Sequence, residues 1–571
     1  MGLPLPQPLP LEIRSPIQHT DFALEANKTQ GLSMNKTLIA GMVAGLFALP
    51  AWAAQVPAGT KLLPDAQQIY VTNIGTEPTT IDPQLVEETA GSAIVNDLFE
   101  GLYELDNTGK IKPAGAVSYE VDKTGTVYTF KLRPEAKWSN GEPVTAADYV
   151  YGWQRAADPK TASNYAWFIE LTGVVNASEV TQGKKSPSEL GIKALDDHTL
   201  QVTLKNPVPF FLKTLAHYTT FPAPKATIEK FGKDWVKPGN IVSNGAFVLK
   251  EWTPNERLSA ERNTHYWNNQ HTVLNKVIYL EIVSETAAYN RYRTGELHYT
   301  TYPLEQYKQL KSKSPEELVS VPTLASYYYV FNTQRKPFDD PKVRKALSLA
   351  IDRETITDKI LGQGQIAAYS FTPPIVDGFE LKKPTSQLQS KEERIKQAKA
   401  LLAEAGYGPD KPLTVDILYN TNESHKKIAL AVSSMWKHNL GVTATLNNME
   451  WKTMVSALNE GDFGVSRYGW NGDYNDASTF LDIMTSSSSA NSGKWFNKEY
   501  DALLAKAHDS LDPAERNALY QQAEALIDAD APIAPIYFSV KSRLLKPFVK
   551  GYPHLNPQDV VYSKELYLVA Q

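Results

Sequence analysis

The chain has 571 residues, a formal net charge of −5, 42% hydrophobic and 21% charged residues, and no cysteine. Its length exceeds what one compact core accommodates, so we expect two to four domains, and its composition is that of an ordinary globular protein. The negative net charge and the lack of a long basic stripe argue against nucleic-acid binding, and the lack of cysteine excludes disulfides, thiol nucleophiles and thiolate metal sites.

The segment that begins at Met34 has the features of a secretory signal peptide. Lys36 supplies a positive charge, an apolar run follows over about residues 38–49, and a small-x-small cleavage pattern ends at Ala53. The sequence therefore predicts a signal peptide over 34–53 and an exported mature protein. The alternative, a membrane anchor, is disfavoured because the run is well short of the roughly 20 residues that a spanning helix needs.

Residues 1–33 are aperiodic, carry several prolines and precede a complete signal peptide. We expect Met34 to be the true start, and the upstream residues to be a disordered extension or an incorrect start in the gene model. No segment after the signal peptide is apolar for long enough to span a membrane, so the mature protein is expected to be soluble.

Between about residues 55 and 321, short strands mix with helices. The segments "TVYTFKL" (126–132) and "TLQVTL" (199–204) alternate polar and apolar side chains, and each places three large apolar side chains on one face. The pattern over residues 55–321 therefore predicts an α+β arrangement.

The segment 412–470 predicts strands that alternate with helices. "PLTVDILYN" (412–420), "VTATLNN" (442–448) and "DFGVSRYGW" (462–470) have the pattern of strands. A helix is predicted between the first two, with Asn422 as its N-cap and Gly441 beyond its end, and "EWKTMVSALNEG" predicts a second helix before the third strand. Strands that alternate with helices imply parallel pairing and a doubly wound α/β sheet.

The segment "RYGWNGDYND" (467–476) crosses the carboxyl end of the third strand. Ligands bind at such strand ends in α/β sheets, so the segment is a candidate binding site, with a surface loop as the alternative. A buried Arg467 would need an anionic partner, and Trp470 and Tyr474 would need packing partners. Asp473 and Asp476 could also form an acid/base pair, although their local spacing does not establish the separation that catalysis requires.

The sequence contains no strong catalytic motif. G-x-S-x-G, H-E-x-x-H, the P-loop and G-x-G-x-x-G are all absent, and the ten histidines lack metal-binding spacing. "LGQGQ" (361–365) follows a helical pattern and predicts a helix end and a turn. His425 lies in the first turn of its predicted helix, where the dipole disfavours protonation and favours anions, so it is either a cap or surface histidine or part of an anion site.

Eight motifs follow one another in the order typical of one family. They are "DLFEGLYE", "AKWSNGEPVTAADYVYGWQRAADPKTAS", "VSNGAFVLKEW", "NTHYWNN", "VRKALSLAIDRETI", "LLAEAGYGPDKPLTVDILYN", "GDYND" and "APIAPIYF". From about Gln55 to the C-terminus, the chain resembles the peptide-binding class of the family 5 extracellular solute-binding proteins.

The resemblance implies an α/β fold of the two-lobe periplasmic binding-protein type (type II-like), with a hinge between the lobes and an extra domain inserted in the first lobe. The boundaries carried over are 55–98, 224–325 and 541–571 for lobe I, 99–223 for the extra domain and 326–540 for lobe II. The strand–helix segment predicted over 412–470 falls inside lobe II.

The resemblance also implies how the ligand is held. Family members bind an extended peptide between the lobes as an added strand. Asp473 would hold the α-ammonium of the peptide, and Arg467 and His425 would serve as cations for its C-terminal carboxylate. The remaining positions that the resemblance assigns to the ladder and to the side-chain pockets are Gly469, Trp470, Asn471, Glu87, Thr89, Tyr165 and Trp451. The aromatic members of this set could instead be ordinary core residues.

Five positions depart from the pattern of relatives. Leu361 and Leu458 stand where a relative has a lysine and an arginine, and Val330 stands in place of a glutamate. Ala325 and Asn471 replace a disulfide pair of some relatives. Fewer cations leave fewer anchors for a carboxylate, so the length and charge of the ligand stay open.

The sequence therefore predicts a periplasmic, non-enzymatic and monomeric solute-binding component of an ABC importer. We expect it to bind short peptides without a cofactor or metal and to dock on its permease through both lobes. A murein-peptide binder is one alternative, although the missing cation at position 458 disfavours it, and a binder of an opine, haem or a nickel chelate is another. A secreted hydrolase and a chaperone-like binder of unfolded chains are the rivals from other classes.

Overall fold

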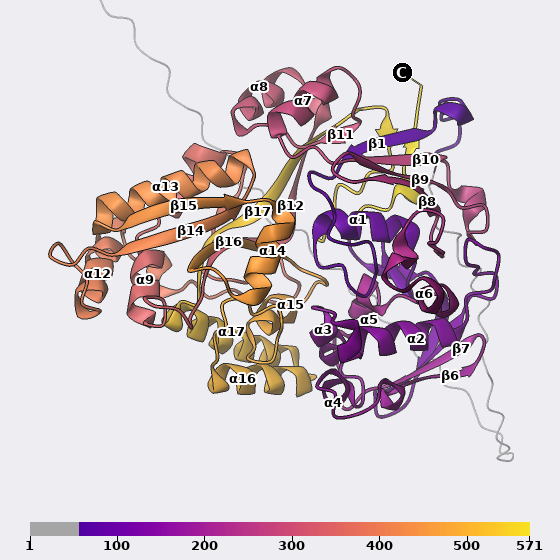
Figure 1. Cartoon of the computed structure of the whole chain (residues 1–571), viewed down its shortest axis with the longest axis horizontal. Helices are drawn as coiled ribbons and strands as arrows, with labels where there is room; N and C mark the ends of the chain where they lie inside the picture. The colour runs from indigo at the N-terminus through magenta and orange to yellow at the C-terminus, as the bar shows by residue number, and fades with distance from the viewer. Residues whose placement is uncertain (1–55, 571) are drawn as a thin grey trace, which may run out of the picture. The chain divides into compact units, whose positions relative to one another are not determined.

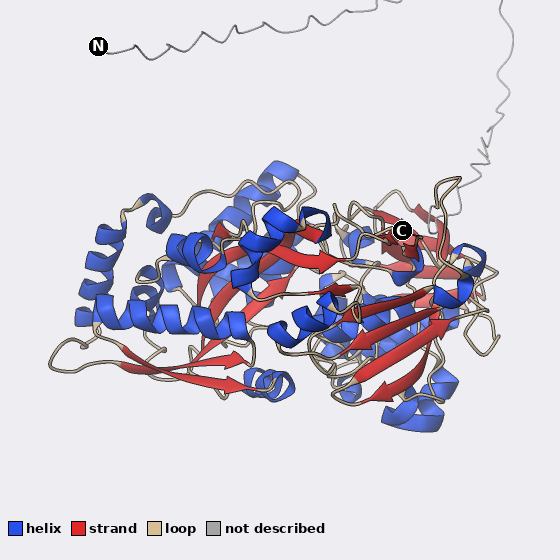
Figure 2. Cartoon of the chain, turned by 90° about the horizontal axis from the view of Figure 1, so that it is seen from above, coloured by secondary structure: helices blue, strands red, loops and turns tan. Residues whose placement is uncertain are grey.

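The structure, a computed structural model, describes residues 56–570, so the predicted signal peptide at 34–53 and the extension at 1–33 lie outside the described range. Within that range, strands and helices mix along the chain, as the sequence predicts for an α/β protein (Figure 2). No helix among these residues combines the length and the apolar character needed to cross a membrane.

An eleven-stranded sheet organises the described residues. In spatial order its strands are β15 (Thr443–Met449), β14 (Thr414–Asn420), β16 (Val465–Asn471), β12 (Leu318–Phe331), β17 (Ile533–Leu545), β11 (Tyr299–Thr300), β1 (Ile69–Asn73), β10 (Lys276–Leu280), β9 (Arg257–Arg262) and β8 (Phe247–Thr253), with β13 (Ile366–Ala367) paired to β17. The two longest strands, β12 and β17, run between the orange strands β14, β15 and β16 and the strands β1, β9 and β10 (Figure 1). One sheet therefore continues through both ends of the molecule.

The predicted strand–helix alternation over 412–470 is confirmed. The chain forms β14, α13 (Glu423–Leu440), β15, α14 (Trp451–Glu460) and β16 in that order. Asn422 caps α13 by accepting the backbone N–H of His425 at 3.0 Å, and Gly441 ends the helix in the left-handed conformation that glycine adopts without strain.

The prediction of parallel pairing is only partly right. β14 pairs in parallel with β15 and β16, but β16 pairs antiparallel with β12, and β12 pairs antiparallel with β17. The sheet is mixed because β12 and β17 are not joined to their neighbours by the strand–helix–strand connections that enforce parallel pairing.

A separate four-stranded sheet lies within residues 99–223. Its strands, in spatial order, are β4 (Ala116–Val121), β5 (Val127–Leu132), β7 (Thr199–Thr203) and β6 (Ile192–Asp196), and every pairing is antiparallel. Phe130 and Leu132 of β5 and Leu200 and Val202 of β7 are buried, as their alternation predicts.

Helices cover these sheets, and short strands complete the chain. The other helices are α1 (Thr89–Leu98), α2 (Ala146–Ala157), α3 (Ala166–Leu171), α4 (Ala177–Thr181), α5 (Phe211–Thr214), α6 (Lys225–Phe231), α7 (Glu285–Arg293), α8 (Tyr307–Lys313), α9 (Pro341–Leu349), α10 (Arg353–Thr355), α11 (Thr385–Leu388), α12 (Lys391–Glu404), α15 (Ser478–Leu481), α16 (Lys498–Asp509) and α17 (Pro513–Asp530). The other strands are β2 (Tyr103–Leu105), β3 (Ile111–Pro113), β18 (Val549–Lys550) and β19 (Tyr567–Leu568).

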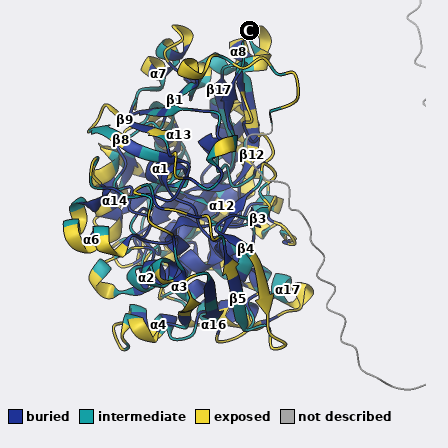
Figure 3. Cartoon of the chain, turned by 90° about the vertical axis from the view of Figure 1, so that its right-hand side faces the viewer, coloured by how far each residue is buried: buried dark blue, intermediate teal, exposed yellow. Residues whose placement is uncertain are grey.

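Buried side chains fill the space between sheet and helices, whereas exposed residues gather on peripheral elements such as α4, α6 and α17 (Figure 3). Around β14, β16, α9 and α13, one apolar cluster contains Ile417, Ile428, Val432 and Trp436, all fully buried. Burial of this apolar face anchors α13 and so fixes the position of its N-terminus.

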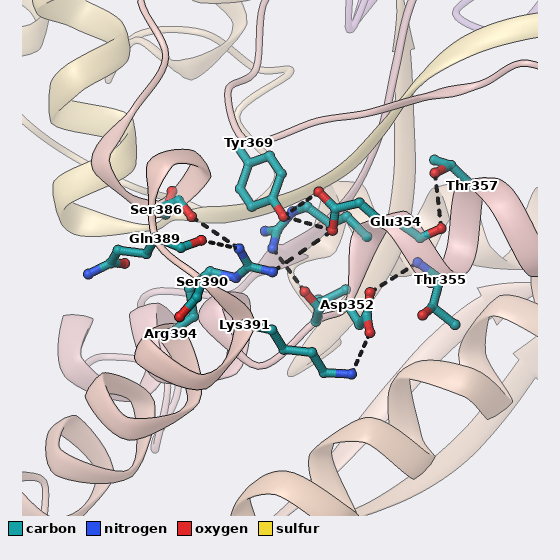
Figure 4. A network of polar contacts seen from close by, with 12 residues as sticks. Asp352, Glu354, Thr355, Thr357, Tyr369, Ser386, Gln389, Ser390, Lys391 and Arg394 are labelled. Carbon is teal, nitrogen blue, oxygen red and sulfur yellow. Dashed lines mark hydrogen bonds and ion pairs between the residues drawn. The ribbon is translucent and has the colours of Figure 1, made fainter.

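A turn follows the π-helix Ile356–Leu361, as predicted for 361–365, because Gly362 takes a left-handed conformation (φ 67°). The helix α10 just before it is held by polar contacts (Figure 4). Asp352 accepts a hydrogen bond from Lys391 at 2.6 Å, and Glu354 accepts one from Tyr369 at 2.8 Å. These contacts tie α10 to α12 and to the loop that leads back to the sheet.

Candidate functional site

A large cavity lies between the two ends of the sheet. Its volume is about 630 Å³, and its walls come from β1, the N-terminus of α1, β12, the first turn of α13, β16 and β17. All ten candidate residues line it, namely Glu87, Thr89, Tyr165, His425, Trp451, Arg467, Gly469, Trp470, Asn471 and Asp473. The structure thus brings together residues from four distant parts of the chain.

One edge of β16 is free where it borders this cavity. β12 pairs with β16 along its full length, from Phe331 opposite Val465 to Ala325 opposite Asn471. On the other side, β14 pairs with β16 only at Val465 and Ser466. Within residues 56–570, the edge of β16 that faces away from β12 therefore has no strand partner after Ser466, and its backbone groups are available to an added strand.

Asp473 lies just beyond this free edge. Its backbone N–H donates to Thr479 Oγ1 at 2.9 Å and its carbonyl accepts from Gln558 Nε2 at 3.0 Å, so the loop is fixed on both sides. The side chain is 8% exposed, and carboxylate oxygen Oδ1 is approached by His217 Nε2 at 3.3 Å and by Tyr165 Oη at 3.4 Å. Oδ2 is buried and has no hydrogen-bond partner in the described part of the chain. A buried carboxylate oxygen without a partner is costly, so this atom is suited to a cationic ligand group.

Aromatic side chains form the wall beside Asp473. Tyr165 stacks on Trp470 with ring centroids 6.3 Å apart and an interplanar angle of 12°, and Trp167 packs on the same indole. The indole N–H groups of Trp470 and Trp451 are buried, and neither finds a hydrogen-bond acceptor among residues 56–570. This wall offers flat apolar surface together with two donors that a ligand could use.

Arg467 contacts neutral side chains among the described residues. Its Nη1 donates to Asn420 Oδ1 at 3.2 Å, and the guanidinium lies 4.8 Å from the centre of the Tyr327 ring. None of the ion pairs in the described residues includes it, and its Nε is buried without a hydrogen-bond partner there. The arginine lines the cavity without an acidic partner in the described structure, so its charge remains available to an anionic ligand group.

The surroundings of His425 disfavour the charged form of its imidazole. Burial and the nearby Arg467 charge hold the pKa of its imidazole well below the ordinary value. Its Nδ1 lies 3.4 Å from the hydroxyl of Tyr327. The role of His425 as a second cation, which the family resemblance implies, stays a prediction, and the surroundings of the ring favour a hydrogen bond over a positive charge.

Glu87 and Thr89 lie on the opposite wall of the cavity. The Glu87 carboxylate accepts hydrogen bonds from Asn164 at 3.2 Å and from Asn459 at 3.4 Å, and burial raises its pKa. Thr89 is exposed and begins α1, whose N-cap is Glu88. Because Asn459 belongs to α14, the Glu87 contact connects the α1 side of the cavity to the α14 side.

Two other residues from the same loop lie outside the cavity. Tyr474 is 1% exposed and stacks on Phe210, so it is a core residue. Asp476 accepts from Tyr520 Oη at 3.0 Å and pairs with Arg516 at 3.5 Å. Asp473 and Asp476 therefore do not face one substrate, and the alternative of a carboxyl pair for catalysis finds no support in this geometry.

The positions that depart from the family pattern divide into two groups. Leu361, Ala325 and Asn471 line the cavity, and Ala325 lies directly opposite Asn471 in the β12–β16 register. Leu458 and Val330 are buried in the core. Among residues 56–570, no cluster of three or more histidine or acidic side chains is placed to hold a metal ion.

Helices α7 and α13 meet at their N-termini beside the cavity, a contact that we call the α7–α13 contact. Glu285, the first residue of α7, accepts hydrogen bonds from Asn422 at 3.3 Å and from Ser424 at 3.0 Å. In the reverse direction, Glu423, the first residue of α13, accepts one from Ser284 at 3.1 Å. Each carboxylate thus lies where helix dipoles favour negative charge, and the two ends of the sheet are tied together.

Comparison with known proteins identifies the family. The sequence model of the bacterial extracellular solute-binding proteins, family 5, matches residues 110–492. The chain belongs to this family. It is 47% identical over 534 residues to the periplasmic oligopeptide-binding protein OppA of Escherichia coli, with 93% of this chain and 97% of that protein covered. It is also 47% identical over 535 residues to the probable deoxycholate-binding periplasmic protein YgiS of the same species, with 93% and 98% covered.

Two structures of a family 5 relative match this chain to different degrees. The murein tripeptide-binding protein MppA of Escherichia coli, 46% identical, superimposes with a TM-score of 0.87, with 88% of this chain and 99% of that chain covered. The unliganded open form of MppA gives only 0.64, with 90% and 99% covered. The two-lobe family fold is therefore present here, and contacts cross the cavity from Glu87 to Asn459 and from His217 to Asp473.

Proposed function

We propose that this protein is the solute-binding component of an ABC importer and binds short peptides in extended form in its cavity. The observation that carries the proposal is the buried, unpaired Oδ2 of Asp473 at the end of the free β16 edge. An α-ammonium satisfies this oxygen, while the peptide backbone continues the sheet along residues 467–471. Arg467, with no acidic partner in the described structure, supplies the charge for the far carboxylate.

The site contains the elements of binding and lacks an arrangement for catalysis, so we propose a non-enzymatic, monomeric protein that needs no cofactor. The relatives OppA, YgiS and MppA are named as periplasmic binding proteins. This supports the periplasm as the site of action and a permease as the partner. Docking would use both lobes, since only the closed form presents both in one fixed orientation.

The proposed division of the chain assigns 55–98, 224–325 and 541–571 to lobe I, 99–223 to an inserted extra domain and 326–540 to lobe II. The chain would then cross between the lobes on β12 and β17. The pairing register of these strands shifts between Pro322 and Ser326, and a bulge at that point supports a hinge there. The separate sheet of β4 to β7 supports the extra domain.

Titration calorimetry with two matched peptides tests the proposal. The mature protein, unfolded and refolded to remove any co-purified ligand, is titrated with tri-lysine and with N-acetyl-tri-lysine. We expect tight binding of the free peptide and about a hundredfold loss on acetylation, because a buried carboxylate left without its partner costs about 2–5 kcal/mol. Equal binding of both peptides, or binding of deoxycholate but of neither peptide, would contradict the proposal.

Weakening the α7–α13 contact is expected to oppose closure. Ser424→Ala removes a hydrogen bond to the half-buried Glu285 carboxylate, worth about 1 kcal/mol, so affinity for tri-lysine should fall about fivefold. Small-angle X-ray scattering with subsaturating peptide should then show a larger open fraction.

Ser424 lines the cavity and could also contact the ligand, so a control variant is needed that weakens the α7–α13 contact from outside the cavity. Thr286→Ala is this control. Thr286 does not line the cavity, and its hydroxyl bonds to Glu423 at 3.2 and 3.4 Å, so this variant should weaken binding in the same direction but less. If neither variant changes affinity or the scattering curve, the contact does not stabilise closure.

A further inference from the structure

Asp473 is contacted by residues far from it in the chain, and one of them is a histidine. His217 Nε2 lies 3.3 Å from Asp473 Oδ1, and the two side chains are only 5% and 8% exposed. Tyr165 Oη approaches the same oxygen at 3.4 Å. Both neighbours use Oδ1, so Oδ2 is left for the ligand.

Hydrogen bonding at Nδ1 determines which nitrogen of the neutral His217 ring carries the proton. His217 caps the short 3₁₀ helix Tyr218–Thr220, and its Nδ1 accepts the backbone N–H of Thr219 at 3.4 Å. A neutral imidazole whose Nδ1 accepts must carry its proton on Nε2, which here faces Asp473. Stacking on Phe168, at 4.3 Å between ring centroids, and on Tyr165, at 5.3 Å, fixes the plane of the ring.

We propose that His217 is the positioning residue of the amine site: as the neutral ring it orients the Asp473 carboxylate, and as the imidazolium it competes with the peptide ammonium. This inference rests on the proposed function, since it assumes an ammonium at Oδ2. The neutral ring places its Nε2 3.3 Å from Oδ1 and leaves the whole negative charge of the carboxylate to the ligand. The imidazolium places a second cation against the same carboxylate.

Protons and peptide therefore compete for Asp473. Peptide binding expels a proton wherever the free protein carries the imidazolium, so affinity falls as the pH decreases. The α-ammonium of a peptide titrates near pH 8 and stays charged below pH 7, so it does not mask this effect.

Other ionisable groups surround His217 and need a control. Those on the neighbouring elements are Asp473, Tyr165, Tyr218, Tyr468, Glu87, Glu88, Glu170, Asp148, Lys213 and the pair of Arg155 with Asp82. Burial and Asp473 raise the pKa of Tyr165 and Tyr218 well above the ordinary value, so both remain neutral. Burial also raises the pKa of Glu87 and Glu88, so these carboxyls could contribute to a pH profile.

Two substitutions at position 217 separate the histidine from these groups. His217→Gln keeps an N–H donor near the position of Nε2 but does not titrate, and His217→Phe keeps a stacking ring but has no donor. Affinity for tri-lysine and N-acetyl-tri-lysine is measured by calorimetry from pH 5.5 to pH 7.0, with thermal melts as the check on folding. Since Glu87 and Glu88 are present in all three proteins, the difference between them isolates His217.

The wild type is expected to bind tri-lysine more weakly at pH 5.5 than at pH 7.0. His217→Gln should bind like the wild type at pH 7.0 and lose most of this dependence, whereas His217→Phe should bind about tenfold more weakly at pH 7.0. If acetylation abolishes binding but the Gln variant keeps the wild-type pH profile, the inference is wrong and the proposed function stands. If acetylation has no effect on the wild type, both are wrong. Should the Phe variant fail to fold, the Gln profile alone decides.

Discussion

Asp473→Asn is expected to reduce the affinity for tri-lysine by about a hundredfold or more, the largest single effect we predict. The substitution keeps the volume of the side chain but removes the negative charge, and the buried Oδ2 of Asp473 has no other partner among residues 56–570. The ammonium of the ligand would then be buried without a counter-charge, which costs about 2–5 kcal/mol. Titration calorimetry of the refolded variant measures this loss directly.

Asp462→Asn is the matched control for this experiment. Asp462 precedes β16, its side chain is 78% exposed, and it pairs with Arg335 on the surface at 3.3 Å. The same chemical change there should leave affinity unaltered. The Asp473→Asn variant should also bind tri-lysine and its acetylated form equally. A variant that still prefers the free amine would show that the ammonium is held elsewhere.

Arg467→Met is expected to abolish the preference for a free C-terminal carboxylate. Methionine keeps the apolar stem of the side chain but removes the guanidinium. In the described structure this guanidinium borders the cavity and has no acidic partner. From Asp473 to Arg467 an extended chain spans at most about 20 Å, and the arginine side chain shortens this distance, so peptides of three to five residues should reach it.

Free and amidated forms of tri- and tetra-lysine measure this effect. In the wild type, amidation should weaken binding of the peptide that reaches Arg467 by about 10- to 100-fold, as expected for a hydrogen bond between charged groups. In Arg467→Met, the free and amidated forms should bind alike. Because burial holds the pKa of His425 well below its ordinary value, this residue should not restore the preference in the variant. An amidation effect that persists in the variant would place the carboxylate against another group.

The strand–helix segment over 412–470 could be predicted because several local signals agree there. Asn422 and Gly441 mark the ends of α13, and the apolar period places Ile428 and Val432 on its buried face. The position of the 467–476 loop at a strand end follows from the same pattern. By contrast, the antiparallel pairing of β12 could not be predicted, since pairing direction depends on how distant segments enter the sheet.

The surroundings of the site were less predictable than its centre. The resemblance to the family pointed to Asp473, Tyr165 and Arg467, but nothing in the sequence near His217 indicates that its ring meets Asp473. Likewise, Arg467 does not pair with an acid in the described structure, because the neighbouring strands place Asn420 and Tyr327 beside it. Such contacts depend on the tertiary arrangement rather than on any local pattern.

A crystal structure of the refolded protein with tri-lysine tests the central claim most directly. The account predicts that the α-amino nitrogen lies within hydrogen-bond distance of Asp473 Oδ2 and that the peptide backbone runs along the free edge of β16 past Gly469. A peptide that lies in the reverse direction, or that leaves Oδ2 without a ligand contact, would contradict it.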